Sequence, residues 1–150
     1  MKYLDDAMKR DLATRLNSAT VHIGRALRRP DAGEDLAAEH RSALGVVYFA
    51  GPIRMGTLAA AERVGAPAMT RTVGILERAG LVRRETDAED SRAVRIRATP
   101  KGTRVVREGR DERVRRIASA LRRMPRPARA RLATAVGDLE ALITELERGD

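Results

Sequence analysis

Arginines are concentrated on a short segment in which polar and apolar residues alternate. They occupy these positions: Arg83, Arg84, Arg92, Arg95 and Arg97. A guanidinium is always charged, and its planar set of donors fits phosphate oxygens and base edges. It is also the side chain favoured in a narrow minor groove, where the negative potential of DNA is concentrated. These residue types at this spacing therefore indicate contact with a nucleic acid.

One acidic residue within the same segment is placed to orient an arginine. Asp90 lies two residues before Arg92, so its carboxylate could hold that guanidinium in a fixed direction. The simpler interpretation is a surface ion pair in a turn, which contributes little to stability. On the first interpretation, Arg84, Asp90, Arg92 and Arg95 belong to a DNA-binding surface.

A second candidate surface lies on a predicted helix over residues 67–79. Its core side is formed by Met69, Thr72, Val73 and Leu76, and its opposite side is formed by Pro67, Ala68, Arg71, Gly74 and Arg78. Arg71 and Arg78 are seven residues apart, so they project within about 20° of each other. Small side chains beside them would let the backbone approach a major groove about 12 Å wide. Thr70 could donate its hydroxyl to a phosphate or a base edge. An ordinary solvated helix face is the alternative.

The elements that must position these side chains form a helix-turn-helix followed by a hairpin. A helix is predicted over residues 55–63, Gly65 and Ala66 form the turn, and Pro67 suits the first helical position. Gly80 ends the second helix. Alternating residues predict strands over 81–86 and 93–98, joined by the polar residues 87–92. A hairpin directly after a helix-turn-helix is a wing, so we expect a winged helix-turn-helix lobe over residues 35–98.

Long amphipathic helices are predicted on both sides of this lobe. The first carries one apolar stripe, from Leu4 to Leu27, and ends before Pro30. A helix over residues 35–50 follows. After Thr99 and Pro100, which suit a helix start, a basic helix runs to about residue 124 and a last helix covers about 127–148. The expected fold is mainly α with a small antiparallel β-hairpin, in one domain over residues 1–150, with dimerisation helices over residues 1–29 and 100–150.

Composition narrows the classes of function. The chain has 30 Lys and Arg and 21 Asp and Glu, and its net charge is therefore +9. Such an excess of positive charge suits a polyanionic partner. There is no cysteine, so thiol redox sensing, cysteine-ligated zinc and disulfides are excluded. The charged N-terminus lacks the apolar run of a signal peptide, and no stretch approaches the roughly 18 apolar residues of a membrane span. We expect a cytoplasmic protein that does not bind a membrane.

The segment from residue 51 to 102 resembles the MarR family of bacterial transcriptional regulators. The family's wing has Asp-x-Arg, five residues and then Leu-Thr; here Asp90, Arg92 and Thr99 match, with Ala98 in place of Leu. Residues 99–102 (TPKG) resemble the continuation into the next helix. Residues 51–59 (GPIRMGTLA), 64–71 (VGAPAMTR) and 76–82 (LERAGLV) resemble the two helices of the motif. Gly74 and Ile75 depart from the family pattern, because polar residues are frequent at these two positions. The resemblance therefore leaves open which DNA sequence the helix would recognise.

The resemblance implies a homodimer in which the first and the last two helices of each chain intertwine. The apolar stripes of the terminal helices support this independently. Two recognition helices would then bind double-stranded DNA at a pseudo-palindrome with half-sites about one helical turn apart. The family implies a repressor, less often an activator. It also implies a small, often phenolic or anionic, effector near His22, His40, Tyr48 and Phe49, although the simpler interpretation of each of these residues is a core residue.

The sequence also allows other interpretations of the function and of the basic helix. Ten arginines and three acids between residues 104 and 129 indicate a solvated basic face or direct phosphate contact. There are three alternatives: an interaction protein with only non-specific DNA binding, an RNA-binding protein, and a zinc site built from His22, His40 and nearby acids. No phosphate loop or catalytic motif is present, so we expect no enzyme activity, no cofactor and no metal.

Overall fold

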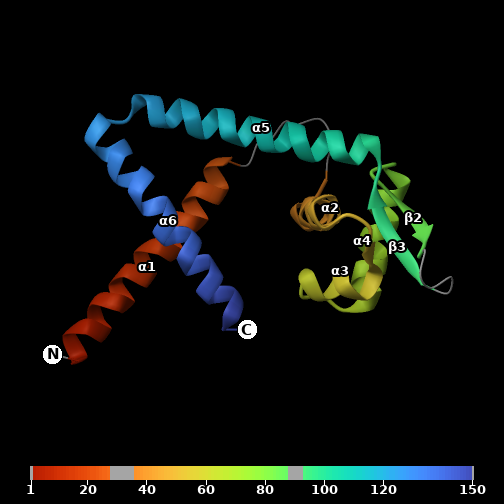
Figure 1. Cartoon of the computed structure of the whole chain (residues 1–150), viewed down its shortest axis with the longest axis horizontal. Coiled ribbons are helices and arrows are strands. Elements are labelled where there is room, and N and C mark those ends of the chain that lie inside the picture. The colour runs from red at the N-terminus through yellow and green to blue at the C-terminus, as the bar shows by residue number, and fades with distance from the viewer. Residues whose placement is uncertain (1, 28–35, 88–92, 150) are drawn as a thin grey trace. The chain divides into compact units, whose positions relative to one another are not determined.

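The protein consists of six helices and three short strands within the described residues. A computed structural model describes residues 2–27, 36–87 and 93–149, with side chains from residue 6 onward. The chain divides into two compact units, Met1–Arg110 and Asp111–Asp150. In chain order (Figure 1) the elements are α1 Lys2–Leu27, α2 Ala38–Ala50, β1 Ile53–Arg54, α3 Met55–Ala61, α4 Ala66–Arg78, β2 Val82–Thr86, β3 Val94–Ala98, α5 Pro100–Arg123 and α6 Arg126–Arg148.

The sheet confirms the predicted antiparallel hairpin and adds a strand to it. β2 pairs with β3, and β1 pairs with the other edge of β3, so the order is β1-β3-β2. Ile53 lies opposite Ile96, and Arg54 lies opposite Arg95. β1 has only two residues, which is too short to show an alternating pattern, and therefore the sequence did not predict it.

Helix boundaries lie near the expected glycine and proline positions, with three corrections. α3 ends at Ala61 and not at the predicted residue 63, and α4 begins at Ala66, which was predicted to lie in the turn. α2 begins at Ala38 and not at the predicted residue 35. Gly80 adopts φ +71°, the left-handed conformation that ends a helix, as predicted. Thr99 is the predicted cap of α5, since its Oγ1 accepts a hydrogen bond of 3.0 Å from the N–H of Gly102. The predicted break at Arg28, Arg29 and Pro30 lies outside the described residues.

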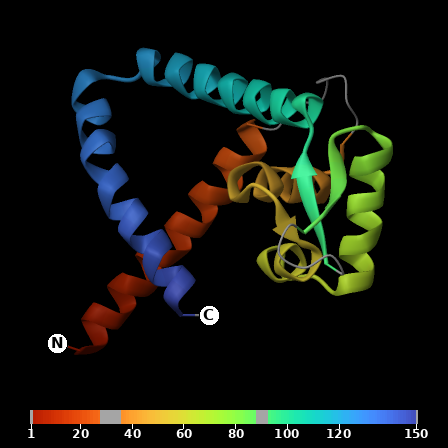
Figure 2. The ribbon, with the colours of Figure 1, turned by 45° about the vertical axis from the view of Figure 1, so that its right-hand side comes forward.

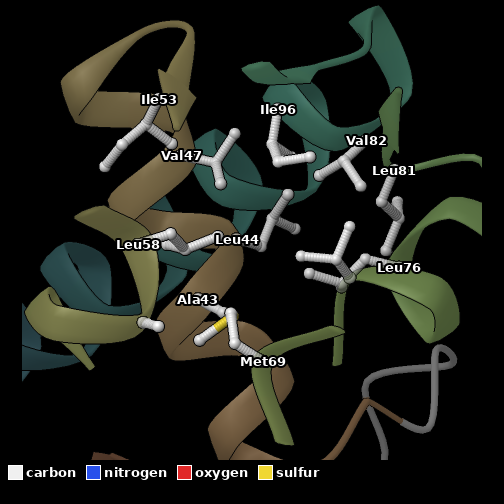
Figure 3. Packing of buried hydrophobic residues seen from close by; sticks show 12 residues of the cluster. Ala43, Leu44, Val47, Ile53, Leu58, Met69, Leu76, Leu81, Val82 and Ile96 are labelled. Atoms are coloured by element: carbon white, nitrogen blue, oxygen red, sulfur yellow. The ribbon is translucent and has the colours of Figure 1, made fainter. Parts of the chain in front are cut away.

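Residues 36–110 contain the hydrophobic core and the side chains packed on it, and from here on we call this range, which is longer than the predicted lobe of residues 35–98, the lobe. Figures 1 and 2 show α2, α3 and α4 around the small sheet, and α2 contacts both α4 and β3. The buried side chains meet in one cluster (Figure 3): Ala43, Leu44, Val47, Ile53, Leu58, Ala59, Met69, Val73, Leu76, Leu81, Val82 and Ile96. Full burial of each larger aliphatic side chain contributes roughly 1.5–3 kcal/mol. This core fixes α4 against the sheet.

The start of α5 is joined closely to the start of β2. A Cβ added to Gly102 would lie 2.0 Å from the carbonyl oxygen of Leu81, so only glycine fits this position. The Thr99 hydroxyl donates to the carbonyl of Gly80 at 2.7 Å, and the Lys101 ammonium donates to the carbonyl of Ala79 at 3.0 Å. The first turns of α5 therefore belong to the lobe.

The terminal helices leave their apolar side chains exposed. No residue of α6 is buried, and α1 has no buried residue between positions 6 and 27. Exposed apolar residues on α6 are Leu132, Val136, Leu139, Leu142, Ile143 and Leu146. Their spacing of three and four residues places them on one side of the helix. In addition, none of the helices in the described ranges is long and apolar enough to cross a membrane.

Candidate nucleic-acid interface

The two faces of α4 divide as the sequence predicted. Met69, Val73 and Leu76 are buried in the core of the lobe. On the other side, Gly74 is half-buried, and the exposed residues are Pro67, Ala68, Thr70, Arg71 and Arg78. The helix therefore presents two cations among small side chains, on a backbone that the core holds in place. This surface fits the major groove of a duplex.

Two residues of this face have features that the sequence did not reveal. The Thr70 hydroxyl donates to the carbonyl of Ala66 at 2.9 Å, so donation to DNA requires it to leave that bond. A Cβ at Gly74 would lie 3.6 Å from Nη1 of Arg78, which is an ordinary contact. The packing of the chain itself therefore does not require glycine at position 74.

The outward face of the sheet is almost entirely charged. The register places Arg54 opposite Arg95, Glu85 opposite Arg95 and Arg83 opposite Arg97, so all five side chains share one face. Their neighbours Ile53, Val82 and Ile96 point to the core. Alternation along each strand thus separates a hydrophobic side, which anchors the sheet, from a cationic side.

Glu85 links two arginines on this face. Its Oε2 accepts from Nε of Arg97 at 2.7 Å, and its Oε1 lies 2.5 Å from Nη2 of Arg83. The hydrogen bond from Arg97, followed by the charges of Arg97 and Arg83, holds the pKa of the Glu85 carboxyl below its ordinary value. Glu85 is therefore ionised at neutral pH and keeps the arginines extended across the strands.

Arg84 lies on the opposite side of β2 and connects it to α4. Its Nε is 3.2 Å from Oε2 of Glu77, and both side chains are partly exposed. A surface ion pair of this kind contributes roughly 0–1 kcal/mol to stability. It nevertheless orients Arg84 along the edge that joins the recognition helix to the hairpin.

Asp87 was not predicted as a site residue, yet it is the only buried polar or charged side chain in the described part of the chain. Its Oδ2 accepts from Nε of Arg54 at 2.9 Å and from Nε of Arg95 at 2.8 Å. Its backbone N–H donates to the carbonyl of Ala93 at 2.9 Å, which continues the pairing one step beyond Thr86 and Val94. The sequence placed Asp87 among the polar residues that join the two strands, because nothing in the spacing links it to Arg54.

The remaining predicted residues of the wing, Asp90 and Arg92, lie outside the described residues. Their proposed pairing stays a prediction. Thr86 pairs with Val94 at the outer end of the strands, and Val82 pairs with Ala98 at the end next to α4 and α5.

The four candidate effector residues have different surroundings. His22 is exposed on α1, and His40 is half-buried on α2. Phe49 is 75% exposed, so its interpretation as a core residue is wrong. The Tyr48 and Phe49 rings are 4.9 Å apart in an edge-to-face arrangement.

Arg107 joins this aromatic pair from α5. Its Nε donates to the Tyr48 hydroxyl at 3.2 Å, and its guanidinium carbon lies 6.0 Å from the centre of the Tyr48 ring. The structure therefore brings together an aromatic pair and a cation, of which the sequence had predicted only the aromatic residues. Across residues 6–27, 36–87 and 93–149, no three His, Asp or Glu side chains are grouped as metal ligands.

Taken together, a helix-turn-helix, an exposed cationic recognition helix and an arginine-rich hairpin define a winged helix-turn-helix DNA-binding protein. The MarR family model matches residues 42–94. An HTH-type transcriptional regulator of Mycobacterium tuberculosis is 31% identical over 134 residues, which cover 89% of this chain and 94% of that protein. The chain belongs to the MarR family of transcriptional regulators.

Solved structures have the same fold. A MarR family protein from Bacillus stearothermophilus superimposes with a TM-score of 0.79 at 22% identity, over 93% of this chain and 97% of that one. A variant of the Staphylococcus aureus regulator MepR, bound to an oligodeoxyribonucleotide, superimposes with a TM-score of 0.67 at 16% identity, over 88% and 97% of the two chains.

Proposed function

We propose that this MarR-family regulator is a cytoplasmic, homodimeric repressor that binds a pseudo-palindromic operator in double-stranded DNA. The observation that carries the proposal is the exposed face of α4, where Arg71 and Arg78 flank small residues on a helix fixed by the core. Two such helices related by a twofold axis would enter successive major grooves about one helical turn apart. The oligodeoxyribonucleotide bound to the MepR variant supports DNA binding by a protein of this fold.

In this proposal the DNA contacts have distinct roles. Pro67, Ala68 and Gly74 let the backbone approach the bases, while Thr70, Arg71 and Arg78 bind base edges or phosphates. The wing carries Arg84 and Arg95 toward the phosphate backbone of the DNA. Arg92, oriented by Asp90, enters the adjacent minor groove. Of these residues, Arg84 must exchange its ion pair with Glu77 for a phosphate.

The exposed apolar faces of the terminal helices support the homodimer. Six large aliphatic side chains are exposed on α6, and Met8, Leu12, Val21 and Ile23 are exposed on α1. A contiguous apolar face of this length on a water-soluble helix is ordinarily covered by another protein surface. A second copy of the same chain supplies an identical apolar face, as a twofold dimer requires.

An effector that releases the operator completes the proposed mechanism. Tyr48, Phe49 and Arg107 offer an aromatic surface beside a cation, which suits a small phenolic or anionic molecule. His22 and His40 are further candidates. The molecule must bind the DNA-incompetent state more tightly than the competent one, because only differential affinity shifts the equilibrium. Unchanged DNA affinity across a library of aromatic acids and phenols at saturating concentration would contradict this part.

The direct test is fluorescence anisotropy with DNA from upstream of the protein's own coding sequence, measured across salt concentrations and with unrelated competitor DNA. We expect one dimer per site, resistance to competitor, and a loss of affinity of at least about tenfold in Arg71→Ala and in Arg92→Ala, as each removes roughly 1–3 kcal/mol of contact. Arg148→Ala is the matched control, because Arg148 pairs with Glu145 in the last turn of α6.

A second candidate function is sequence-independent DNA binding by a dimeric interaction protein. The observation that favours it is the segment from residue 113 to 131, which contains eight arginines and no acidic residue. Such a segment binds phosphates without discriminating between sequences. Equal affinity for operator and competitor, with a steep dependence on salt, would establish this function in place of the specific repressor.

A further inference from the structure

Asp87 holds two guanidinium groups beside each other at the outer end of the β2–β3 pair. Arg54 comes from β1, Arg95 comes from β3, and both donate through Nε to the same Oδ2 atom of Asp87, at 2.9 and 2.8 Å. Nη2 of Arg54 is also 2.9 Å from that atom. Two guanidinium cations this close repel each other, and the negative charge of the shared Asp87 carboxylate offsets that repulsion. The three side chains together carry a formal charge of +1.

The charges of this cluster are separated between the interior and the surface. The Asp87 side chain is 0% exposed, whereas the side chains of Arg54 and Arg95 are 50% and 33% exposed. Solvent and ligands therefore meet the two guanidinium groups and not the carboxylate. The Glu85 cluster on the same face differs, because 26% of the Glu85 side chain is exposed between its arginines.

The position of the cluster is set by rigid elements. Arg54 and Arg95 lie directly opposite each other in the sheet, and Arg54 immediately precedes the first helix of the helix-turn-helix. The neighbouring residues Ile53 and Ile96 are in the buried core. The two guanidinium groups are thus fixed by backbone pairing and by the buried carboxylate, so little conformational freedom remains to be lost on binding.

We infer that Arg54 and Arg95, held by Asp87, form a binding site for one phosphate group of the DNA backbone at the outer end of the β2–β3 pair. Paired guanidinium groups bind phosphate oxygens through charge-assisted hydrogen bonds. The site rests on the proposed DNA-binding function and extends it to Arg54, which lies outside the recognition helix and outside the hairpin. It positions the lobe on the duplex without reading the sequence.

The test is the salt dependence of operator binding by Arg54→Gln, with Arg54→Lys and Arg148→Gln measured beside it. Each phosphate contact contributes about −0.9 to the slope of log K against log salt concentration. We expect Arg54→Gln to make the slope shallower by about 1.8 per dimer, since it removes two contacts, and to affect all DNA sequences equally. Arg54→Lys should retain most of the slope but bind more weakly, because it keeps the charge and loses the planar donors.

The outcomes separate the possibilities. Arg148→Gln removes a paired surface arginine from α6 and should leave the slope unchanged. Loss of affinity in Arg54→Gln without a change of slope, in a variant that melts as the wild type does, would mean that Arg54 only supports the wing and would overturn the phosphate site. An unchanged affinity and slope would overturn it as well. If the wild type itself does not bind DNA, the proposed function fails before the site is tested.

Discussion

The lobe and the terminal helices differ in how much of their apolar surface the chain itself covers. In the lobe, twelve apolar side chains from α2, α3, α4, the sheet and Leu81 are buried in one cluster. On α6, every described residue is at least partly exposed, and aliphatic residues such as Leu139 and Ile143 face solvent. The lobe thus buries a core of its own, whereas the apolar faces of the terminal helices are left for the proposed dimer to cover. On this proposal, DNA recognition and dimerisation depend on separate apolar surfaces.

The largest effect should follow from charging the apolar face of α6. Leu139→Glu combined with Ile143→Glu removes four aliphatic side chains from a twofold dimer, at roughly 1.5–3 kcal/mol each, and buries carboxylates in their place. We expect the dissociation constant of the dimer to rise at least about a thousandfold, measured by sedimentation equilibrium. Ala133→Glu with Ala141→Glu, on the polar side of α6, is the control and should remain dimeric.

A substitution in the lobe should instead lower the stability of the lobe and leave the dimer interface unaffected. Gly102→Ala places a Cβ 2.0 Å from the Leu81 carbonyl oxygen, and the resulting shift of backbone should cost about 3 kcal/mol of lobe stability. Urea unfolding followed by circular dichroism measures this loss. Gly137→Ala in α6 is the matched control, because nothing lies within 4 Å of its new Cβ; it should stabilise the helix by up to about 1 kcal/mol. A neutral Gly102→Ala would contradict the close joint between α5 and β2.

A smaller effect is expected at the turn between α3 and α4. Arg63 adopts φ +54°, which costs a non-glycine residue roughly 1 kcal/mol. Arg63→Gly should therefore raise the free energy of unfolding of the lobe by about 0.5 kcal/mol, after the greater entropy of glycine in the unfolded chain is allowed for. Gly80→Ala, at φ +71°, should destabilise it. If the two substitutions change the free energy of unfolding in the same direction, backbone conformation does not explain these changes.

The smallest effect concerns the ion pairs of Glu85. Since its pKa is lowered in the folded state, the contribution of Glu85 to stability is present above its ordinary pKa of about 4.3 and is lost as pH falls through the lowered value. The stability difference between wild type and Glu85→Gln should be constant from pH 7 to about pH 5 and vanish in stronger acid. A difference that persists at pH 2 would mean that shape, and not charge, explains the role of Glu85.

Sequence reasoning succeeded where local chemistry determines the structure. Glycine and proline at positions 80 and 100 marked real helix boundaries, and the spacing of Met69, Val73 and Leu76 identified the buried side of α4. It missed β1, because two residues carry no periodicity. It missed the role of Asp87, because its partner Arg54 is 33 residues away and becomes its neighbour only through the strand pairing. The DNA contacts of Asp90 and Arg92 stay predictions.

Hydrogen exchange of the wild type and of the Leu139→Glu/Ile143→Glu variant tests the central claim most directly, because it reports the stability of each region separately. We expect amides of α1 and α6 to exchange much faster in the monomeric variant, while amides of α4 and of the β2–β3 pair keep the protection they have in the wild type. Equal protection of α6 in the variant and the wild type would contradict the claim, since the chain would then cover its own terminal helices.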